Sequence, residues 1–125
     1  MTTRKEFLMQ SGMLAAGVVL LPSFTLPYKN PKKNLGVQLY TFRKEMLEDA
    51  VGTLKRIAAL GIKQIESARS TKGLYYGLAP KEMKSVCEDL GMTLRSGHVA
   101  LDEHWKETMD QAAEAGQEYL ICSSM

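Results

Sequence analysis

Two residues of this sequence bring proton-transfer chemistry to the ends of predicted strands: Glu66 and His98. A carboxylate can accept a proton or orient a hydroxyl group, and an imidazole can bind an oxygen atom, carry a proton or ligate a metal. Ser96 precedes His98 by two positions, so their side chains share one face of a strand. We predict that Glu66 and His98 are catalytic and that Ser96 binds substrate. The alternative for each is a polar group with a structural role.

Three further residues have side chains suited to a polar ligand. Gln38 and Tyr40 share the interior face of the first predicted strand, where either could hydrogen-bond a hydroxyl group or simply fill the interior. Tyr76 lies in the loop 73–77, which is suited either to stacking on a sugar or to packing on the domain. We predict substrate contacts for all three. His104 falls inside a predicted helix and is interpreted as a surface or packing residue.

Several classes of function are excluded by what the sequence lacks. It contains no glycine-rich phosphate loop, no paired-cysteine metal motif and no Gly-x-Ser-x-Gly segment, which argues against nucleotide hydrolases, zinc ribbons and serine esterases. The net charge of +2 comes largely from the amino-terminal third, without a basic stripe of interleaved aromatic residues, so nucleic acid is not expected as a partner. A metal site needs at least three converging ligands, and this chain supplies two, so no metal ligand is assigned.

Three glycines predict the secondary structure that must position these side chains. Gly61, Gly91 and Gly116 each end a helical run and precede an apolar one, as expected of glycines that close helices in the left-handed conformation. Their spacing of roughly 25 to 30 residues matches one strand-plus-helix unit of a parallel repeat. Pro80 and Asp102 are placed to begin two of the helices. We expect strands at residues 35–40, 63–68, 93–98 and 119–123, and helices at residues 48–60, 80–90 and 102–115.

The predicted fold class is therefore α/β: about four parallel strands with three helices, as in part of a (β/α)₈ barrel. A closed barrel needs about 200 to 250 residues, and this chain has 125. Parallel folds place their chemistry at the carboxyl ends of the strands, so Ser96 and His98 would line the barrel mouth if Leu94 points into the barrel. Such a sheet has two open edges. Either the rest of the barrel lies outside this sequence, or two copies form a homo-oligomer.

Residues 1–28 have the layout of an export signal. Arg4 and Lys5 precede an uncharged stretch from Met9 to Tyr28, whose apolar part is too short for a stable membrane span. The pattern resembles a twin-arginine (Tat) signal peptide with lysine in the second basic position, which predicts export to the periplasm. The alternative is an uncleaved anchor or a helix packed on the domain. Residues 29–34 are expected to form a linker and residues 35–125 the domain.

Four segments of the chain carry a family resemblance: Gly36-Val37-Gln38-Leu39-Tyr40, Leu60-Gly61-Ile62-Lys63-Gln64-Ile65-Glu66, Tyr75-Tyr76-Gly77-Leu78-Ala79-Pro80-Lys81-Glu82 and Ser96-Gly97-His98-Val99. In this order and spacing they resemble the amino-terminal half of the sugar phosphate isomerase/epimerase family, the xylose isomerase-like TIM barrels. The resemblance implies metal-assisted isomerisation or epimerisation of a sugar or polyol-like substrate. It also implies a divalent metal (Mn, Mg, Zn or Co) held mostly by later strands, so that this chain alone would be inactive.

Two other functions remain open. The chain could be a non-catalytic half-barrel that binds a sugar or assembles with a second half. A relative of the apurinic endonucleases is the other alternative, but such a protein needs a basic mouth that grips phosphate. Only Arg69 and Lys72 lie near the predicted mouth, which disfavours this second alternative.

Overall fold

The computed structural model of the chain describes residues 34–122. The predicted signal segment and most of the predicted linker fall on residues 1–33, outside the described range. The last three residues of the chain, 123–125, also lie outside it. Within the described range, no helix combines the length and the apolar character that crossing a membrane would require.

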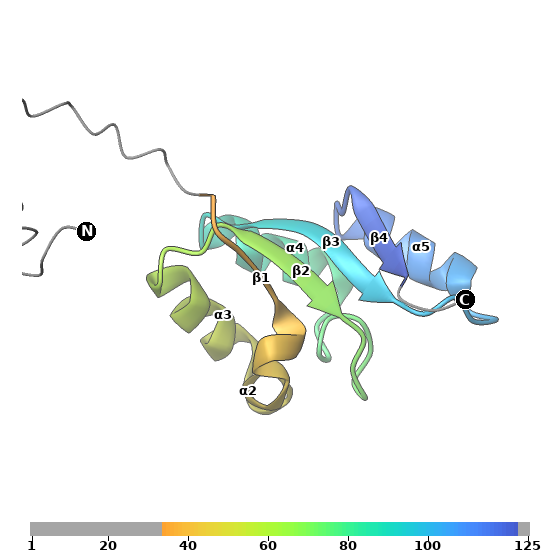
Figure 1. Cartoon of the computed structure of the whole chain (residues 1–125), viewed down its shortest axis with the longest axis horizontal. Helices are drawn as coiled ribbons and strands as arrows, with labels where there is room; N and C mark the ends of the chain where they lie inside the picture. The colour runs from red at the N-terminus through yellow and green to blue at the C-terminus, as the bar shows by residue number, and fades with distance from the viewer. Residues whose placement is uncertain (1–33, 123–125) are drawn as a thin grey trace, which may run out of the picture. The chain divides into compact units, whose positions relative to one another are not determined.

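Four parallel strands form the sheet, in the spatial order β1-β2-β3-β4 (Figure 1). The strands are β1 (Gly36–Gln38), β2 (Gln64–Ala68), β3 (Thr93–Val99) and β4 (Tyr119–Cys122). Helices α3 (Ala50–Ala59), α4 (Pro80–Asp89) and α5 (Trp105–Glu114) connect them in turn. A parallel neighbour requires such a crossover, because the chain must return to the starting end of the sheet. The predicted alternation of strand and helix is therefore confirmed.

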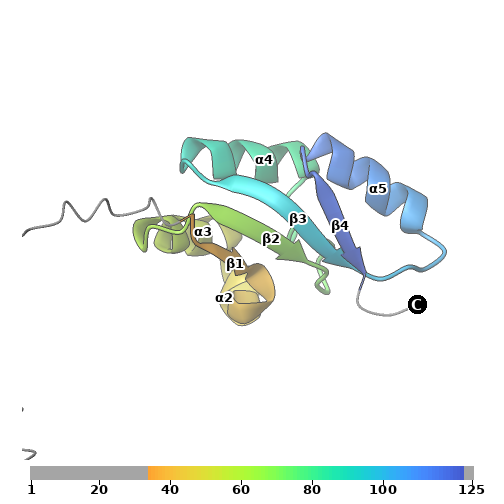
Figure 2. The ribbon, with the colours of Figure 1, turned by 45° about the horizontal axis from the view of Figure 1, so that its top comes forward.

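The helices and the sheet enclose one apolar core. Leu54 and Ile57 of α3 and Met83 and Cys87 of α4 join Ile65 of β2 in a single buried cluster. Figure 2 shows α4 and α5 on the same side of the sheet, with the opposite side uncovered by described residues. The sheet thus has a helix-covered face and an open face, and the open face is the one that can carry a binding site.

The three predicted helix-closing glycines have the expected conformation. Gly61, Gly91 and Gly116 adopt φ angles of +84°, +67° and +74°, in the left-handed region that residues with a Cβ atom avoid. Each amide also donates to a carbonyl three residues earlier, at 2.9 to 3.0 Å. The chain therefore leaves each helix by the same turn and enters the next strand in the same direction.

The beginning of the domain differs from the prediction. The predicted strand 35–40 is shortened to Gly36–Gln38, and Leu39–Phe42 form a 3₁₀ helix, η1. An additional helix, α2 (Arg43–Glu48), precedes α3, which begins after Asp49 accepts a hydrogen bond from the amide of Gly52 at 2.9 Å. Fully buried side chains of η1 and α2, Leu39 and Met46, hold these turns on the core. Tertiary burial has overridden the local strand pattern.

The predicted cap of the last helix is also displaced. Helix α5 begins at Trp105, and Asp102 lies in the turn before it. Its carboxylate accepts a hydrogen bond from the His104 amide at 2.9 Å and pairs with the guanidinium of Arg69. Asp102 was expected to cap the helix directly, but its ion pair with the loop after β2 keeps it in the turn.

A bulge in β3 decides which side chains reach the open face. Leu94 pairs with Ile65, whereas the next residue of β2, Glu66, pairs with Ser96, so Arg95 is an extra residue. Leu94 consequently belongs to the buried core. We expected Leu94 to point into the barrel together with Ser96 and His98, and this expectation is wrong for Leu94. The bulge shifts the alternation, so that Ser96 still lies on the same face as Glu66.

Gln117, at the entry to β4, ties two strands together on the helix side. Its amide nitrogen donates to Ser67 Oγ at 3.1 Å and to the Ser96 carbonyl at 3.0 Å. Gly97 leaves room for this side chain, because a Cβ atom there would lie 3.0 Å from Gln117 Oε1 and 3.1 Å from Ser67 Oγ. A Cβ atom at position 97 would thus require Gln117 or Ser67 to move.

We predict that Gly97→Ala destabilises the fold by about 1 to 3 kcal/mol, the usual cost of an extra carbon atom in a filled interior. Urea denaturation monitored by circular dichroism measures the loss. Gly97→Ala should destabilise the Gln117→Ala variant less than it destabilises the parent. The reason is that Gln117→Ala has already removed the side chain that the new Cβ atom would displace. An equal cost in both backgrounds would show that Gln117 is not what position 97 must accommodate.

The Arg69–Asp102 pair predicts a pH dependence. The hydrogen bond from Arg69 and then the bond from the His104 amide lower the pKa of Asp102. A lowered pKa means that the pair contributes stability above the ordinary aspartate pKa and loses it as the pH falls through the lowered value. The stability difference between the parent and Asp102→Asn should therefore shrink between pH 7 and about pH 2.5.

Urea midpoints at both pH values measure this difference, with Asp110→Asn on the exposed side of α5 as the matched control. A parent-to-variant difference that does not change with pH would show that the charge of Asp102 contributes nothing.

Candidate functional site

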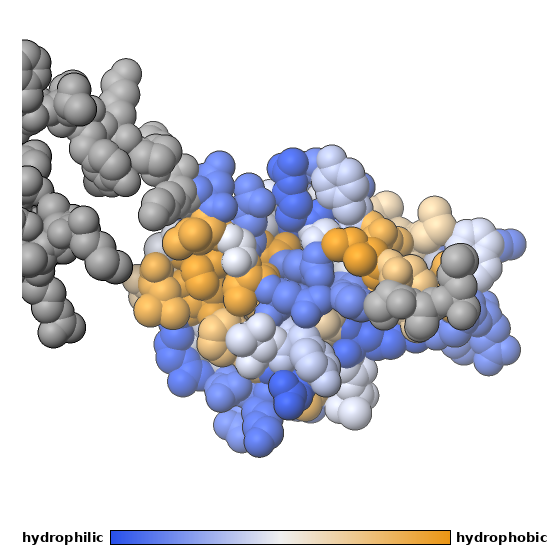
Figure 3. Space-filling view, in the orientation of Figure 1, coloured by the Kyte–Doolittle hydropathy of each residue, from blue (hydrophilic) through white to orange (hydrophobic). Residues whose placement is uncertain are grey.

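Four polar side chains from three neighbouring strands meet on the open face. Gln38 of β1 is aligned with Glu66 of β2, and Glu66 is aligned with Ser96 of β3. His98, two positions further along β3, is aligned with Ala68 at the end of β2. Figure 3 views this face and shows hydrophilic side chains gathered between two hydrophobic areas. The sequence had placed all four residues among the site candidates, and the sheet register brings them together.

The four side chains form one connected hydrogen-bond network. The amide nitrogen of Gln38 lies 2.6 Å from Glu66 Oε1 and 2.8 Å from His98 Nδ1. Ser96 Oγ donates to the other carboxylate oxygen, Glu66 Oε2, at 2.7 Å. Each oxygen of the half-buried carboxylate therefore has a donor from the protein, and the network holds Glu66 and His98 in fixed positions.

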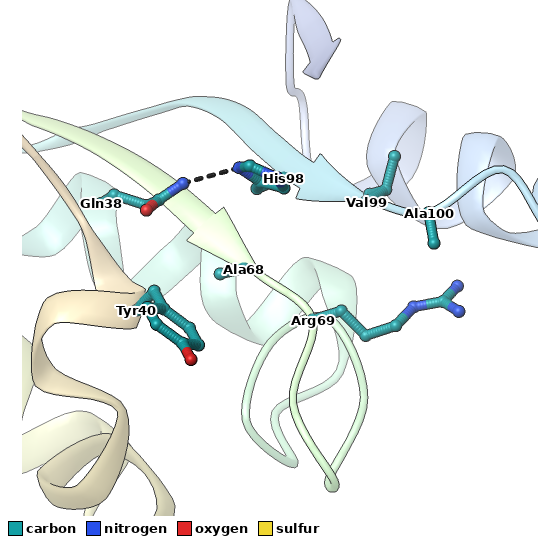
Figure 4. A pocket seen from close by; sticks show the side chains of 7 residues that line it. All are labelled: Gln38, Tyr40, Ala68, Arg69, His98, Val99 and Ala100. Atoms are coloured by element: carbon teal, nitrogen blue, oxygen red, sulfur yellow. Dashed lines mark hydrogen bonds between the residues drawn. The ribbon is translucent and has the colours of Figure 1, made fainter. Parts of the chain in front are cut away.

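A pocket of about 300 Å³ opens beside this network (Figure 4). It lies at the carboxyl ends of the strands, since Ala68 ends β2 and Val99 ends β3. Parallel α/β folds bind their ligands at this end of the sheet. The lining residues are Gln38, Tyr40, Ala68, Arg69, His98, Val99 and Ala100.

Arg69 forms part of the pocket rim. Its backbone amide donates to the His98 carbonyl at 3.2 Å, which extends the β2–β3 pairing by one residue. Its guanidinium pairs with Asp102 and donates to Thr108 Oγ1 at 3.1 Å. The side chain thereby connects the loop after β2 to the loop before α5. From sequence, Arg69 was noticed only as a basic residue near the mouth, and its place directly after a predicted strand was the one available signal.

Tyr40 reaches the pocket by a different route from the one predicted. It lies in η1 rather than in a strand, and it is 53% exposed. The guanidinium of Arg43 covers the Tyr40 ring at 4.6 Å from the ring centre, as in a cation–π contact, and also donates to the Tyr40 carbonyl at 3.3 Å. Strand alternation therefore does not place Tyr40 beside Gln38, although both line the pocket.

Tyr76 lies in the core and is not among the residues that line the pocket. It is 4% exposed and has a φ angle of +55°, which is unusual for a residue with a side chain. Burial raises the pKa of its hydroxyl group. Tyr75 is likewise buried, and the pKa of its hydroxyl group is also raised by burial. In this structure the loop has the packed arrangement rather than that of a wall or lid over the ligand.

The described residues do not make a metal site. Among residues 34–122, no group of three or more His, Cys, Asp or Glu side chains converges. Glu66 and His98 approach one another, with 3.8 Å between Oε1 and Nδ1, but these atoms are already bonded to Gln38. His104 is exposed and contacts Glu103 instead of the pocket. No chemical step is therefore assigned to a metal here.

Comparisons with known proteins give matches among solved structures. No protein-family model and no curated protein matches the chain. One crystal structure of a sugar phosphate isomerase/epimerase from Parabacteroides distasonis matches 84% of this chain at 23% identity, with a TM-score of 0.64. A second sugar phosphate isomerase/epimerase structure from the same organism matches 73% of the chain at 26% identity, with a TM-score of 0.62.

The chain spans less than half of each matched structure, 44% of the first and 41% of the second. The four parallel strands and their helices correspond to a part of the barrel in those proteins. The predicted fold class, a partial (β/α)₈ barrel, is confirmed. The described residues thus have the fold of part of a sugar phosphate isomerase/epimerase, the family that the sequence resembles.

Proposed function

We propose that residues 34–122 form one wall of the substrate pocket of a sugar isomerase or epimerase. The observation that carries this proposal is the network of Gln38, Glu66, Ser96 and His98 beside the pocket at the carboxyl ends of β1 to β3. The likeness to structures described as sugar phosphate isomerase/epimerases supports it.

The pocket has the size for a small polyhydroxylated molecule, and its lining combines apolar surface with polar side chains. Its volume of about 300 Å³ is at the lower end of the range for small-molecule sites. The imidazole of His98 and the guanidinium of Arg69 offer hydrogen bonds to substrate oxygens, while Ala68 and Val99 provide apolar contact. Glu66 holds Gln38 and Ser96 in place, since each of its oxygens accepts a hydrogen bond from one of them.

The proposed enzyme needs more polypeptide than the described residues. The open face of the sheet requires a second wall to enclose a substrate, and the matched structures are more than twice as long as the matched part. A divalent metal belongs to this proposal only if that second wall supplies ligands, since the described wall provides no site for one.

A second candidate function is an assembly module in which two copies of the chain cover one another. The exposed apolar side chains of β4 favour it: Tyr119, Leu120 and Ile121 are 56%, 36% and 42% exposed. Exposed apolar strands at a sheet edge are sites of chain association. This candidate predicts a dimer by size-exclusion chromatography with light scattering, and Ile121→Lys should dissociate it. A monomer over the whole accessible concentration range would contradict it.

The enzymatic proposal predicts that sugars or sugar phosphates perturb His98 selectively. His98 and His104 are the two histidines of the chain, so their ring signals in an NMR titration are easily assigned. We expect one or more aldoses, ketoses or their phosphates to shift the His98 signals and leave those of His104 unchanged. His98→Ala should weaken binding about tenfold, corresponding to one lost hydrogen bond, whereas His104→Ala should not. A sugar or sugar phosphate that shifts the signals of both histidines equally, or that binds His98→Ala as tightly as the parent, would refute the proposal.

A further inference from the structure

We propose that Gln38 is a positioning residue that keeps the proton of neutral His98 on Nε2. The described wall of the pocket then offers its ligand a hydrogen-bond donor and not a base. The assignment of the tautomer depends only on the hydrogen-bond network. Its meaning for a substrate rests on the proposed function.

The first step is the orientation of the Gln38 amide. One end of the amide lies 2.6 Å from Glu66 Oε1 and 2.8 Å from His98 Nδ1. A nitrogen at this end carries two protons, one for each neighbour. An oxygen there would set its lone pairs against the ionised carboxylate, and Ser96 already donates to the other carboxylate oxygen. The charge of Glu66 therefore fixes the amide with its nitrogen toward the histidine.

The second step is the protonation of the imidazole. Since the Gln38 amide donates to Nδ1, that ring nitrogen must carry a lone pair. A neutral imidazole has one proton, so it resides on Nε2. Within the described residues, Nε2 of His98 makes no hydrogen bond, and His98 lines the pocket. In Figure 4 the ring turns Nδ1 toward Gln38, which leaves Nε2 available to a ligand.

The charged groups around the ring are consistent with this arrangement. On the sheet, Glu66 Oε1 is 3.8 Å from His98 Nδ1. The Gln38 amide nitrogen lies between these two atoms and contacts both. On the pocket rim, Arg69 is paired with Asp102. The direct contact that decides the tautomer is therefore the one with Gln38.

In the proposed reaction, His98 then acts as a hydrogen-bond donor and a different group acts as the base. A neutral imidazole with its proton on Nε2 can polarise a carbonyl oxygen or bind a hydroxyl oxygen, and it does so by a hydrogen bond without proton transfer. It cannot accept a proton at the same nitrogen. Each oxygen of Glu66 accepts one hydrogen bond from the protein. The donor at His98 Nε2 therefore leaves the removal of a proton from substrate carbon to another group of the proposed enzyme.

Nuclear magnetic resonance of the full chain with ¹⁵N-labelled histidine tests the tautomer directly. The spectra are recorded at about pH 8.5, about two units above the ordinary pKa of a histidine side chain. We expect His98 to show an unprotonated Nδ1 and a protonated Nε2, as a single tautomer. The exposed His104 should show the average of the two tautomers and serves as the internal reference. Averaged signals for His98 would overturn the proposal.

Gln38→Glu reverses the interaction while keeping the shape of the side chain. The new carboxyl lies where the Gln38 amide is 2.6 Å from Glu66 Oε1, so the two carboxyls share one proton between them. The remaining negative charge of the pair accepts a hydrogen bond from the imidazole, so we expect Nδ1 of His98 to become protonated. Ser96→Ala is the matched control, because Ser96 contacts Glu66 but not His98. In this control, His98 should have the same tautomer as in the parent. An Nδ1 that stays unprotonated in Gln38→Glu would overturn the proposal.

If Gln38→Glu does not fold, Gln38→Met provides the second test. It removes the donor without adding charge, and His98 should then show the same averaging as His104. An unchanged single tautomer in Gln38→Met would show that Gln38 does not set it. Because these measurements need no substrate, their failure is distinguishable from the failure of sugar binding in the titration above.

Discussion

The carboxylate of Glu66 is the group on which the open face of the sheet depends. It accepts hydrogen bonds from Gln38 of β1 and Ser96 of β3, so one charge on the central strand orients side chains from both neighbours. The Gln38 amide that bonds to Glu66 also contacts Nδ1 of His98, so Glu66 influences the orientation of the imidazole beside the pocket. A half-buried charge requires donors nearby, and this requirement couples three strands that the backbone ladder alone would leave independent on this face.

The helix-covered face supports that arrangement from behind. The bulge at Arg95 shifts the alternation of β3, so Leu94 enters the core while Ser96 lies on the open face. On the other side of the same strand, Gln117 fills the space above Gly97 and bonds to Ser67 and the Ser96 carbonyl. The side chains of the site are thus directed by a backbone irregularity that is itself held by polar contacts on the helix side.

The pocket rim carries hydrogen-bond donors that are suited to a ligand with several oxygen atoms. Arg69 extends from the end of β2 to Asp102 and Thr108, so the loops after β2 and β3 are joined where the pocket opens. The donors around the cavity, His98 and Arg69, belong to adjacent strand ends. This is the place at which parallel α/β proteins generally bind ligands, and it agrees with the fold shared with sugar phosphate isomerase/epimerase structures.

The sequence by itself determined the order of strands and helices, because its signals are local. Gly61, Gly91 and Gly116 end helices because glycine adopts the left-handed conformation without a steric clash. Pro80 begins α4 as predicted. The sequence also identified Glu66, Ser96 and His98 as candidate site residues on the second and third strands. Only the tertiary structure decided that a bulge turns Ser96 away from Leu94, that Tyr40 lies in a 3₁₀ helix and that Tyr76 is buried. Those outcomes depend on pairing and packing between residues far apart in the chain, which local propensity does not record.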